Sequence, residues 1–219
     1  MTRALIIAID GPSGAGKGTV ARAVALRLGY RHVDTGAMYR AVAWKALHEG
    51  FDPANESAVA TIAERASFDL AHDAIVIDGH DVSRAIRTPE IDQAAAIVAR
   101  HPGVRRTLVA RQRQYGEQGG VVMEGRDIGT VVFPHADVKI YLDASPEERA
   151  RRRAADPAHS AKGVRLAEVA TALAERDRSD STRPASPLAV AADAIVIDTT
   201  GVAIEQVVDQ ILKTVESRR

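Results

Sequence analysis

Residues 5–28 read LIIAIDGPSGAGKGTVARAVALRL. The first six residues form a short apolar run, which is typical of a buried strand. Glycines follow at Gly11, Gly14 and Gly16. After Gly18, apolar residues recur at spacings of three and four, which predicts an amphipathic helix. The stretch therefore predicts a strand, a glycine-rich loop and a helix in direct succession.

This succession is typical of a phosphate-binding loop, residues 11–19 (GPSGAGKGT). Glycines adopt backbone conformations that let successive N–H groups converge on phosphate oxygens. The N-terminus of the helix adds its unpaired N–H groups, and Lys17 adds a mobile full charge. In this chain Gly18 follows the lysine and the hydroxyl comes one place later, at Thr19. This variant of the motif favours small kinases acting on nucleotides.

Composition narrows the class of protein. The chain has 219 residues, of which 46% are hydrophobic. This is enough for one core domain with one or two insertions. Lysine plus arginine equals aspartate plus glutamate at 29 each, which argues against broad nucleic-acid binding. Cysteine is absent, so disulfides and thiolate metal sites are excluded and a reducing cytoplasm fits. No apolar run approaches the roughly 20 residues of a membrane span, and no leader is evident, so we expect a soluble, unprocessed cytoplasmic protein.

Short apolar runs alternate with helical patterns along the chain. The runs cover residues 5–10, 32–34, 121–124, 138–142 and 194–198. The alternation predicts an α/β fold, with a parallel sheet and helices on both faces. Between these runs, residues 68–70, 74–77 and 80–82 predict small antiparallel strands with a tight turn at Asp78 and Gly79, which we interpret as an inserted subdomain. Residues 156–163 have the composition of a mobile loop.

Two further stretches follow predicted strands, where open parallel sheets place their ligands. DTGAMYR, residues 34–40, predicts a second phosphate site, with Arg40 one helical turn beyond Gly36. Thr35 there is equally explained as a helix cap. EGRDIGT, residues 124–130, has an Arg126–Asp127 pair flanked by glycines, which favours a functional loop over a surface ion pair.

Two later helices carry candidate charged residues. A serine cap followed by proline and two glutamates predicts a helix over residues 147–155, with Arg149, Arg152 and Arg153 on one face. A second helix has a stripe that begins apolar and ends charged. Its members are Leu166, Val169, Leu173, Arg176 and Asp180. We expect the charged end to face a cleft, although an ordinary i,i+4 pair explains it as well.

The chain resembles bacterial cytidylate kinases, within the nucleoside monophosphate kinases. The resemblance covers nearly the whole chain, through IDGPSGAGKGT, DTGAMYR, IRTPEI, EGRDIGTVVFP, KIYLDAS and RDRSDSTR in family order. It implies a P-loop NTPase-type sheet of about five parallel strands, an inserted antiparallel monophosphate-binding subdomain and a short lid. We expect one domain, 1–219, with a core at 1–34, 100–150 and 180–219, the monophosphate-binding region at 35–99 and the lid at 151–165.

The resemblance also implies roles. The donor would be ATP with Mg²⁺, the acceptors CMP and dCMP, and the protein a monomer without nucleic-acid or membrane partners. The ATP-phosphate residues would be Gly11, Pro12, Ser13, Gly14, Ala15, Gly16, Lys17, Gly18 and Thr19. The acceptor phosphate would be held by Thr35, Arg40 and Arg126, and the cytosine by Arg105 and Asp127. The remaining substrate contacts would come from Tyr39, Arg176, Asp180 and Arg183. The catalytic residues would be Lys17, Arg126, Arg149 and Arg153, and no residue is assigned as a direct metal ligand.

Two departures from the family pattern leave alternatives open. Glu124 stands where an aspartate is often found ahead of GRD, so whether it helps to hold magnesium, directly or through water, is left open. Ala96 stands where some family members carry a serine that touches the base, so UMP is a possible second acceptor. Kinases for UMP, AMP or shikimate are the nearest enzymatic rivals. A nucleotide-dependent switch or an RNA-binding module is the rival from another class, although no guanine-reading NKxD motif is present and the charge is balanced.

Overall fold

The central element of the fold is a parallel sheet. The computed structural model describes residues 4–70, 74–156 and 165–218. Its strands are β1 (Ile6–Asp10), β2 (Arg31–Asp34), β6 (Val121–Gly125), β7 (Val138–Asp143) and β8 (Ile195–Asp198). They form a 5-stranded sheet in the order β2-β6-β1-β7-β8, and every neighbouring pair is parallel. The predicted parallel sheet is confirmed, and each strand lies within two residues of its predicted run.

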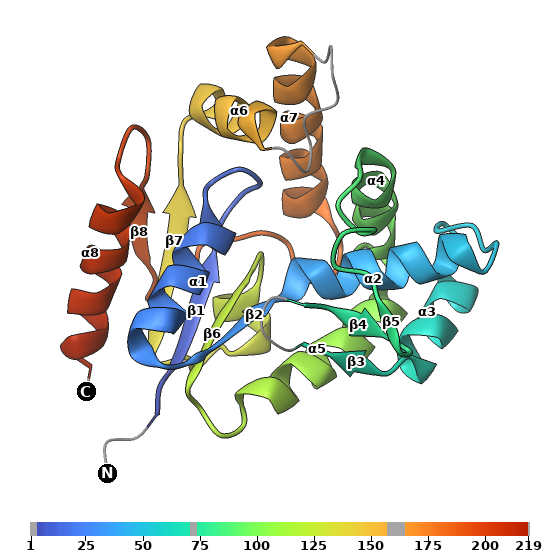
Figure 1. Cartoon of the computed structure of the whole chain (residues 1–219), viewed down its shortest axis with the longest axis horizontal. Helices are drawn as coiled ribbons and strands as arrows, with labels where there is room; N and C mark the ends of the chain where they lie inside the picture. Colours follow the sequence, from blue (N-terminus) through green and yellow to red (C-terminus); the bar gives the residue numbers. More distant parts are fainter. Residues whose placement is uncertain (1–3, 71–73, 157–164, 219) are drawn as a thin grey trace. The chain divides into compact units, whose positions relative to one another are not determined.

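Helices separate the strands along the chain (Figure 1). Their bounds are α1 Lys17–Leu28, α2 Thr35–His48, α3 Glu56–Arg65, α4 Pro89–Val98, α5 Pro102–Gly116, α6 Pro146–Ala155, α7 Leu166–Thr182 and α8 Ile204–Glu216. The predicted start of α6 is confirmed, because the Ser145 hydroxyl accepts a hydrogen bond from the Glu148 N–H at 3.2 Å. None of the helices in the described ranges is long and apolar enough to span a membrane.

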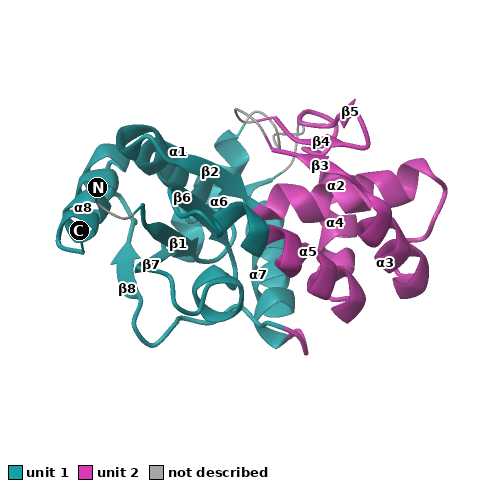
Figure 2. Cartoon of the chain, turned by 90° about the horizontal axis from the view of Figure 1, so that it is seen from below, with its two compact units in different colours: residues 1–34, 113–182, 186–219 teal, residues 35–112, 183–185 magenta. Residues whose placement is uncertain are grey.

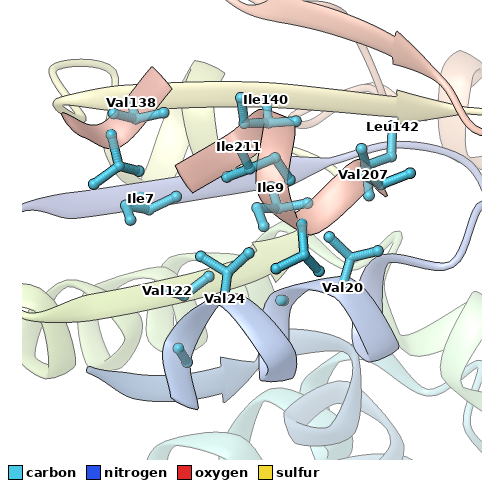
Figure 3. Packing of buried hydrophobic residues seen from close by; sticks show 14 of the residues in the cluster. Ile7, Ile9, Val20, Val24, Val122, Val138, Ile140, Leu142, Val207 and Ile211 are labelled. Carbon is cyan, nitrogen blue, oxygen red and sulfur yellow. The ribbon is translucent and has the colours of Figure 1, made fainter. Parts of the chain in front are cut away.

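One hydrophobic core joins the sheet to α1 and α8. Alternate residues of β1 and β7, such as Ile7, Ile9 and Ile140, point toward Val24 of α1 and Ile211 of α8 (Figure 3). Each of these side chains is at most 1% exposed. Burying a side chain of this size contributes roughly 1.5–3 kcal/mol. The apolar face of α1 is therefore held on the sheet, which fixes where its N-terminus lies.

The topology gathers the strand ends at one edge. Because all five strands are parallel, their carboxyl ends lie on the same side of the sheet. Asp10 pairs with Gly125 and Tyr141, and Asp34 pairs with Glu124. The phosphate loop starts directly after Asp10, at the centre of this edge, where the chain turns from β1 into α1.

A small antiparallel sheet confirms the predicted insertion. Its strands are β3 (Phe68–Asp69), β4 (Val76–Ile77) and β5 (His80–Asp81), in the order β3-β4-β5. Asp78 and Gly79 have φ values of 48° and 79°, as a two-residue hairpin turn with both central residues left-handed requires.

The chain divides into two compact units (Figure 2). The first comprises residues 1–34, 113–182 and 186–219 and contains the parallel sheet. The second comprises residues 35–112 and 183–185 and contains the small sheet with α2, α3, α4 and most of α5. The loop predicted at 156–163 lies, apart from Asp156, outside the described residues, and so does most of the C-terminal part of the predicted lid.

The stripe predicted on α7 is correct only in its second half. Leu173 and Asp180 are 7% and 4% exposed, whereas Leu166 is 52% exposed. The first turns of α7 thus extend beyond the core, and the apolar residue at the start of the pattern is solvated. Among the described residues, burial begins near the middle of the helix.

Gly11 provides a test of the loop's close packing. A Cβ at Gly11 would lie 2.0 Å from the Leu142 carbonyl oxygen, and its φ is +148°. Gly29 also has a positive φ, +67°, but nothing lies within 4 Å of its Cβ position. We expect Gly11→Ala to lower the free energy of unfolding by about 3 kcal/mol or more, and Gly29→Ala by about 1 kcal/mol. Urea denaturation of both variants measures the difference; equal losses would contradict the packing argument.

Candidate active site

The phosphate loop has the backbone predicted for an anion cradle. Gly11, Gly14 and Gly16 have φ values of 148°, 82° and 88°. Gly16 is the N-cap of α1, so no side-chain cap covers the first N–H groups of the helix. These N–H groups and the positive end of the helix dipole therefore remain directed at the loop, where an anion binds favourably.

Lys17 is the buried cation of the loop. It is 6% exposed, and its Nζ donates a hydrogen bond to the Pro12 carbonyl oxygen at 2.7 Å. Burial, and secondarily the nearby positive charge of Arg126, lower the pKa of Lys17 to about 7. Glu124, Asp10 and Asp180 act in the opposite direction. The ammonium form thus lacks full charge compensation, which a bound polyphosphate would supply.

Gly18 lies against an acidic side chain. A Cβ at Gly18 would lie 3.1 Å from Oε1 of Glu124. The same oxygen lies 3.1 Å from Nε2 of His32 on β2, and both side chains are largely buried, at 13% exposed for His32 and 9% for Glu124. The hydrogen bond and charge of Glu124 outweigh burial and raise the pKa of His32 above its ordinary value. Glycine at position 18, in place of the usual serine or threonine, therefore leaves room for the Glu124 side chain.

The GRD segment continues into a π-helical turn. Residues Ile128–Val132 form this turn, which we had predicted only as a loop. The Asp10 carboxylate accepts hydrogen bonds from the Ile128 and Gly129 N–H groups at 2.8 and 2.7 Å. Burial raises the pKa of Asp10 to about 6, against the effect of these two bonds. Asp10 thus anchors the segment that carries Arg126 and the buried Asp127.

Arg126 is tied to α7. Its Nε donates to Oδ2 of Asp180 at 2.9 Å, and its Nη1 donates to the Gly125 carbonyl at 3.3 Å. Nε of Arg176 lies 3.7 Å from the same Asp180 oxygen, so the i,i+4 pair is present as well. The charge and hydrogen bond of Asp180 raise the pKa of Arg126 despite burial. The structure therefore brings together Arg126, Arg176 and Asp180; the sequence predicted the Arg176–Asp180 pair but not its contact with Arg126.

Two arginines of α6, Arg149 and Arg152, contact backbone carbonyls of the phosphate loop. Arg149 donates to the Ser13 and Ala144 carbonyls at 3.2 and 3.1 Å and to the Asp177 carboxylate. Arg152 donates to the Thr199 hydroxyl and carbonyl at 2.9 and 2.6 Å and to Glu148. Arg151, which is not among the three arginines predicted to share a face, is exposed.

A pocket of roughly 690 Å³ opens beside the phosphate loop in the first unit. Its lining includes Gly16, Thr19, Arg153, Val202 and Ile204. This volume lies within the range of small-molecule sites, and the lining mixes apolar side chains with cationic ones. The pocket is large enough for a nucleoside next to the anion cradle.

The second unit holds the other predicted residues. Thr35, Tyr39 and Arg40 lie in the first turns of α2, and Arg105 lies on α5. The Arg105 guanidinium lies over the Tyr39 ring at 5.4 Å, and its Nη1 donates to the Ala99 carbonyl at 3.3 Å. Thr35 and Arg105 are 4% and 3% exposed. Arg183, just beyond α7, is 5% exposed.

Three residues with clear contacts were missed in the sequence: Asp10, His32 and Asp177. Asp10 ends the strand immediately before the loop, and this position was a usable signal. Asp177 lies beside Arg176 in RDRSDSTR but off the stripe that we followed. Nothing in the sequence signals that His32 reaches Glu124, because the two are 92 residues apart and meet only through strand pairing.

The parallel sheet and the phosphate loop together define a P-loop kinase fold. A shikimate kinase structure from Bacteroides thetaiotaomicron has a TM-score of 0.53 over 97% of this chain and 98% of its own, at 12% identity, which speaks for the fold alone. The cytidylate kinase family model matches residues 7–217. A cytidylate kinase of Solibacter usitatus is 50% identical over 98% of this chain and 93% of its own. One of Desulfitobacterium hafniense is 52% identical over 97% and 93%. The chain belongs to the cytidylate kinase family.

The lowered pKa of Lys17 predicts a pH-dependent stability effect. The folded-state pKa is about 7, below the ordinary value of 10.5, so between these values the unfolded chain binds the extra proton and stability rises with pH. Below pH 7 the buried ammonium destabilises the fold most. We expect Lys17→Met to raise the midpoint of thermal unfolding, and to raise it more at pH 6 than at pH 9. Calorimetry at both pH values measures this; a larger gain at pH 9 would contradict the direction of the shift.

Proposed function

We propose that the chain transfers the γ-phosphoryl group of ATP to CMP and dCMP, giving the nucleoside diphosphate and ADP. The observation that carries the proposal is the family match over residues 7–217, which includes every residue predicted to contact a nucleotide. The anion cradle at residues 11–19 supports it independently, because it is built for a polyphosphate.

The donor side of the reaction is assigned to the first unit. The N–H groups of residues 11–19 and the Lys17 ammonium hold the phosphates of ATP, and the pocket lined by Arg153 and Val202 takes the nucleoside. A triphosphate restores the charge balance that burial denies to Lys17. Lys17, Arg126, Arg149 and Arg153 stabilise charge on the moving phosphoryl group.

The acceptor roles are assigned to three groups of residues. Thr35, Arg40 and Arg126 bind the monophosphate, while Arg105 and Asp127 bind the base. The other substrate contacts come from Tyr39, Arg176, Asp180 and Arg183. Cytosine offers an amino donor beside ring acceptors, so a carboxylate and a guanidinium match it. Uracil presents an oxygen acceptor in place of the amino group and leaves a buried carboxylate without its donor.

The chemistry needs no strong general base, since the attacking phosphate oxygen is already anionic near pH 7. Catalysis then depends on aligning donor and acceptor and on neutralising charge. Exclusion of water from the reacting phosphates prevents hydrolysis of ATP.

Magnesium fits the residues present. In the described ranges, no group of three or more histidine or acidic side chains is placed to hold a metal ion. Mg²⁺ bound to a triphosphate keeps several waters and needs few ligands from a protein. The Glu124 carboxylate, beside Gly18, is the residue that would approach it through water. When bound, the ion neutralises phosphate charge.

We assign the protein to the cytoplasm as a monomer. The absence of cysteine fits a reducing compartment. Sedimentation of the purified protein tests the monomeric state, and cell fractionation tests the location.

An acceptor panel tests the proposed function. ADP release is measured with CMP, dCMP, UMP, AMP and shikimate, with Lys17→Met as the inactive control, which we expect to lower turnover about 100-fold or more. We expect the highest kcat/KM for CMP and dCMP. Slow hydrolysis that does not depend on any acceptor would indicate a switch instead, and a preference for AMP or shikimate would overturn the assignment of the acceptor.

Asp127 provides a test of base recognition. We expect Asp127→Ala to reduce the ratio of kcat/KM for CMP to that for UMP by about tenfold or more, because it removes the group that uracil mismatches. The KM for ATP should change much less. An unchanged CMP-to-UMP ratio would contradict the role assigned to this carboxylate.

A further inference from the structure

Helix α7 contacts two parts of the phosphate site through two carboxylates, three residues apart. Asp180 accepts from Nε of Arg126 at 2.9 Å. Asp177 accepts from the Ser13 N–H at 3.2 Å and from Arg149. Residues at i and i+3 lie on the same side of a helix, so the two carboxylates form one acidic edge. We propose that Asp177 is a positioning residue, which holds the phosphate loop and Arg149 in register with Arg126. This inference rests on the proposed function.

The contacts around Ser13 form a closed arrangement. The Ser13 N–H donates to Oδ1 of Asp177, and the Ser13 carbonyl accepts from Nη1 of Arg149 at 3.2 Å. Arg149 also donates to the second oxygen of Asp177. Both backbone polar groups of Ser13 are thus held by one ion pair, and the pair joins α6 to α7.

This arrangement restrains the loop next to one of its glycines. Ser13 precedes Gly14, whose φ is 82°. A Cβ at Gly14 would lie 2.9 Å from Cβ of Arg149, so α6 lies directly against the loop. Glycine-rich backbone loses much entropy when a ligand orders it. A loop already fixed at Ser13 loses less of it on binding, which favours ATP binding.

Burial and charge distinguish this pair from a surface ion pair. The side chains of Arg149 and Asp177 are 11% and 20% exposed. Exposed pairs contribute little, because water and salt screen them. The Asp177 charge also acts on Arg126, whose pKa it helps to raise. Asp177 therefore contacts the loop and Arg149 directly, whereas it acts on Arg126 only through charge, because the hydrogen bond that holds Arg126 comes from Asp180.

A merely structural role makes a different prediction. If the pair only packed α6 against α7, its loss would lower stability and leave ATP affinity as it is. If Asp177 positions the loop, its loss weakens ATP binding selectively, because the loop amides and Arg149 contact ATP while the cytosine-binding residues are not attached to Ser13. The two roles separate in the KM values for ATP and for CMP.

The experiment uses Asp177→Asn in the full chain. Binding of a non-hydrolysable ATP analogue with magnesium is measured by calorimetry without CMP, well below the unfolding midpoint. We expect the Kd to rise about tenfold, in line with the coupling expected of a contacting group. In the kinase assay the KM for ATP rises by a similar factor, and the KM for CMP stays within about twofold. The matched control is Asp209→Asn, whose partner is Arg27 in an exposed pair with both side chains 58% exposed, and it should change neither value.

A double-mutant cycle tests whether Asp177 acts through Arg149. Arg149→Met should weaken binding of the analogue by at least as much as Asp177→Asn, because it also removes a contact to ATP, and the double variant should lose no more than Arg149→Met alone, because residues of one unit are not additive. If the losses of affinity in the two single variants add up in the double variant, Asp177 does not act through Arg149.

Unchanged affinity in Asp177→Asn, or equal rises in both KM values, would overturn the proposal. If that variant does not fold, Asp177→Glu is measured with the same criteria, since it keeps the charge and moves the carboxylate by one methylene. Because the binding measurement contains no CMP, it is independent of the acceptor panel: failure of the panel with weakened analogue binding would reject the proposed function and leave the positioning role in place.

Discussion

A buried cation at the carboxyl edge of the sheet imposes a charge balance on the groups around it. Lys17 is 6% exposed, and its charge is opposed by Arg126 and favoured by Glu124, Asp10 and Asp180. The carboxylates come from three different elements, namely β1, β6 and α7. Because a desolvated ammonium is costly without such partners, the positions of these strands and of α7 are coupled to the loop. A bound polyphosphate would supply the negative charge that these carboxylates do not fully provide to Lys17.

The apolar packing beneath this edge makes the arrangement possible. The core between the sheet, α1 and α8 places the N-terminus of α1 at the end of β1. Gly11 lies so close to Leu142 that the loop leaves the strand without room for a side chain. The energy that holds the polar site in place therefore comes from side chains that contact no ligand, such as Ile9 and Ile140.

The sequence predicted the features that depend on local patterns. The strands, the small antiparallel sheet with its Asp78–Gly79 turn and the Ser145 cap all follow from periodicity and turn chemistry, and the structure confirms them. The resemblance to cytidylate kinases, based on several motifs in order, led to the family that the comparisons show. The roles of the individual site residues remain predictions.

What escaped prediction depends on contacts between distant segments. The π-helical turn at Ile128–Val132 requires the Asp10 carboxylate, which lies more than a hundred residues earlier, to accept two N–H bonds. Likewise, Asp177 meets Ser13 across 164 residues. Leu166 shows the opposite failure, since a regular pattern continued past the end of the core. Periodicity describes one element at a time, whereas these features depend on which elements become neighbours.

The narrow space beside Gly18 has a consequence for how such chains can diverge. The helix position and the strand-end acid share one small volume, since a Cβ on the former would come within 3.1 Å of Glu124, and His32 keeps that carboxylate from withdrawing freely. A side chain after the lysine would therefore require this carboxylate to shift by a few tenths of an ångström. Substitutions at position 18 and at position 124 are for this reason expected to constrain one another as such chains diverge.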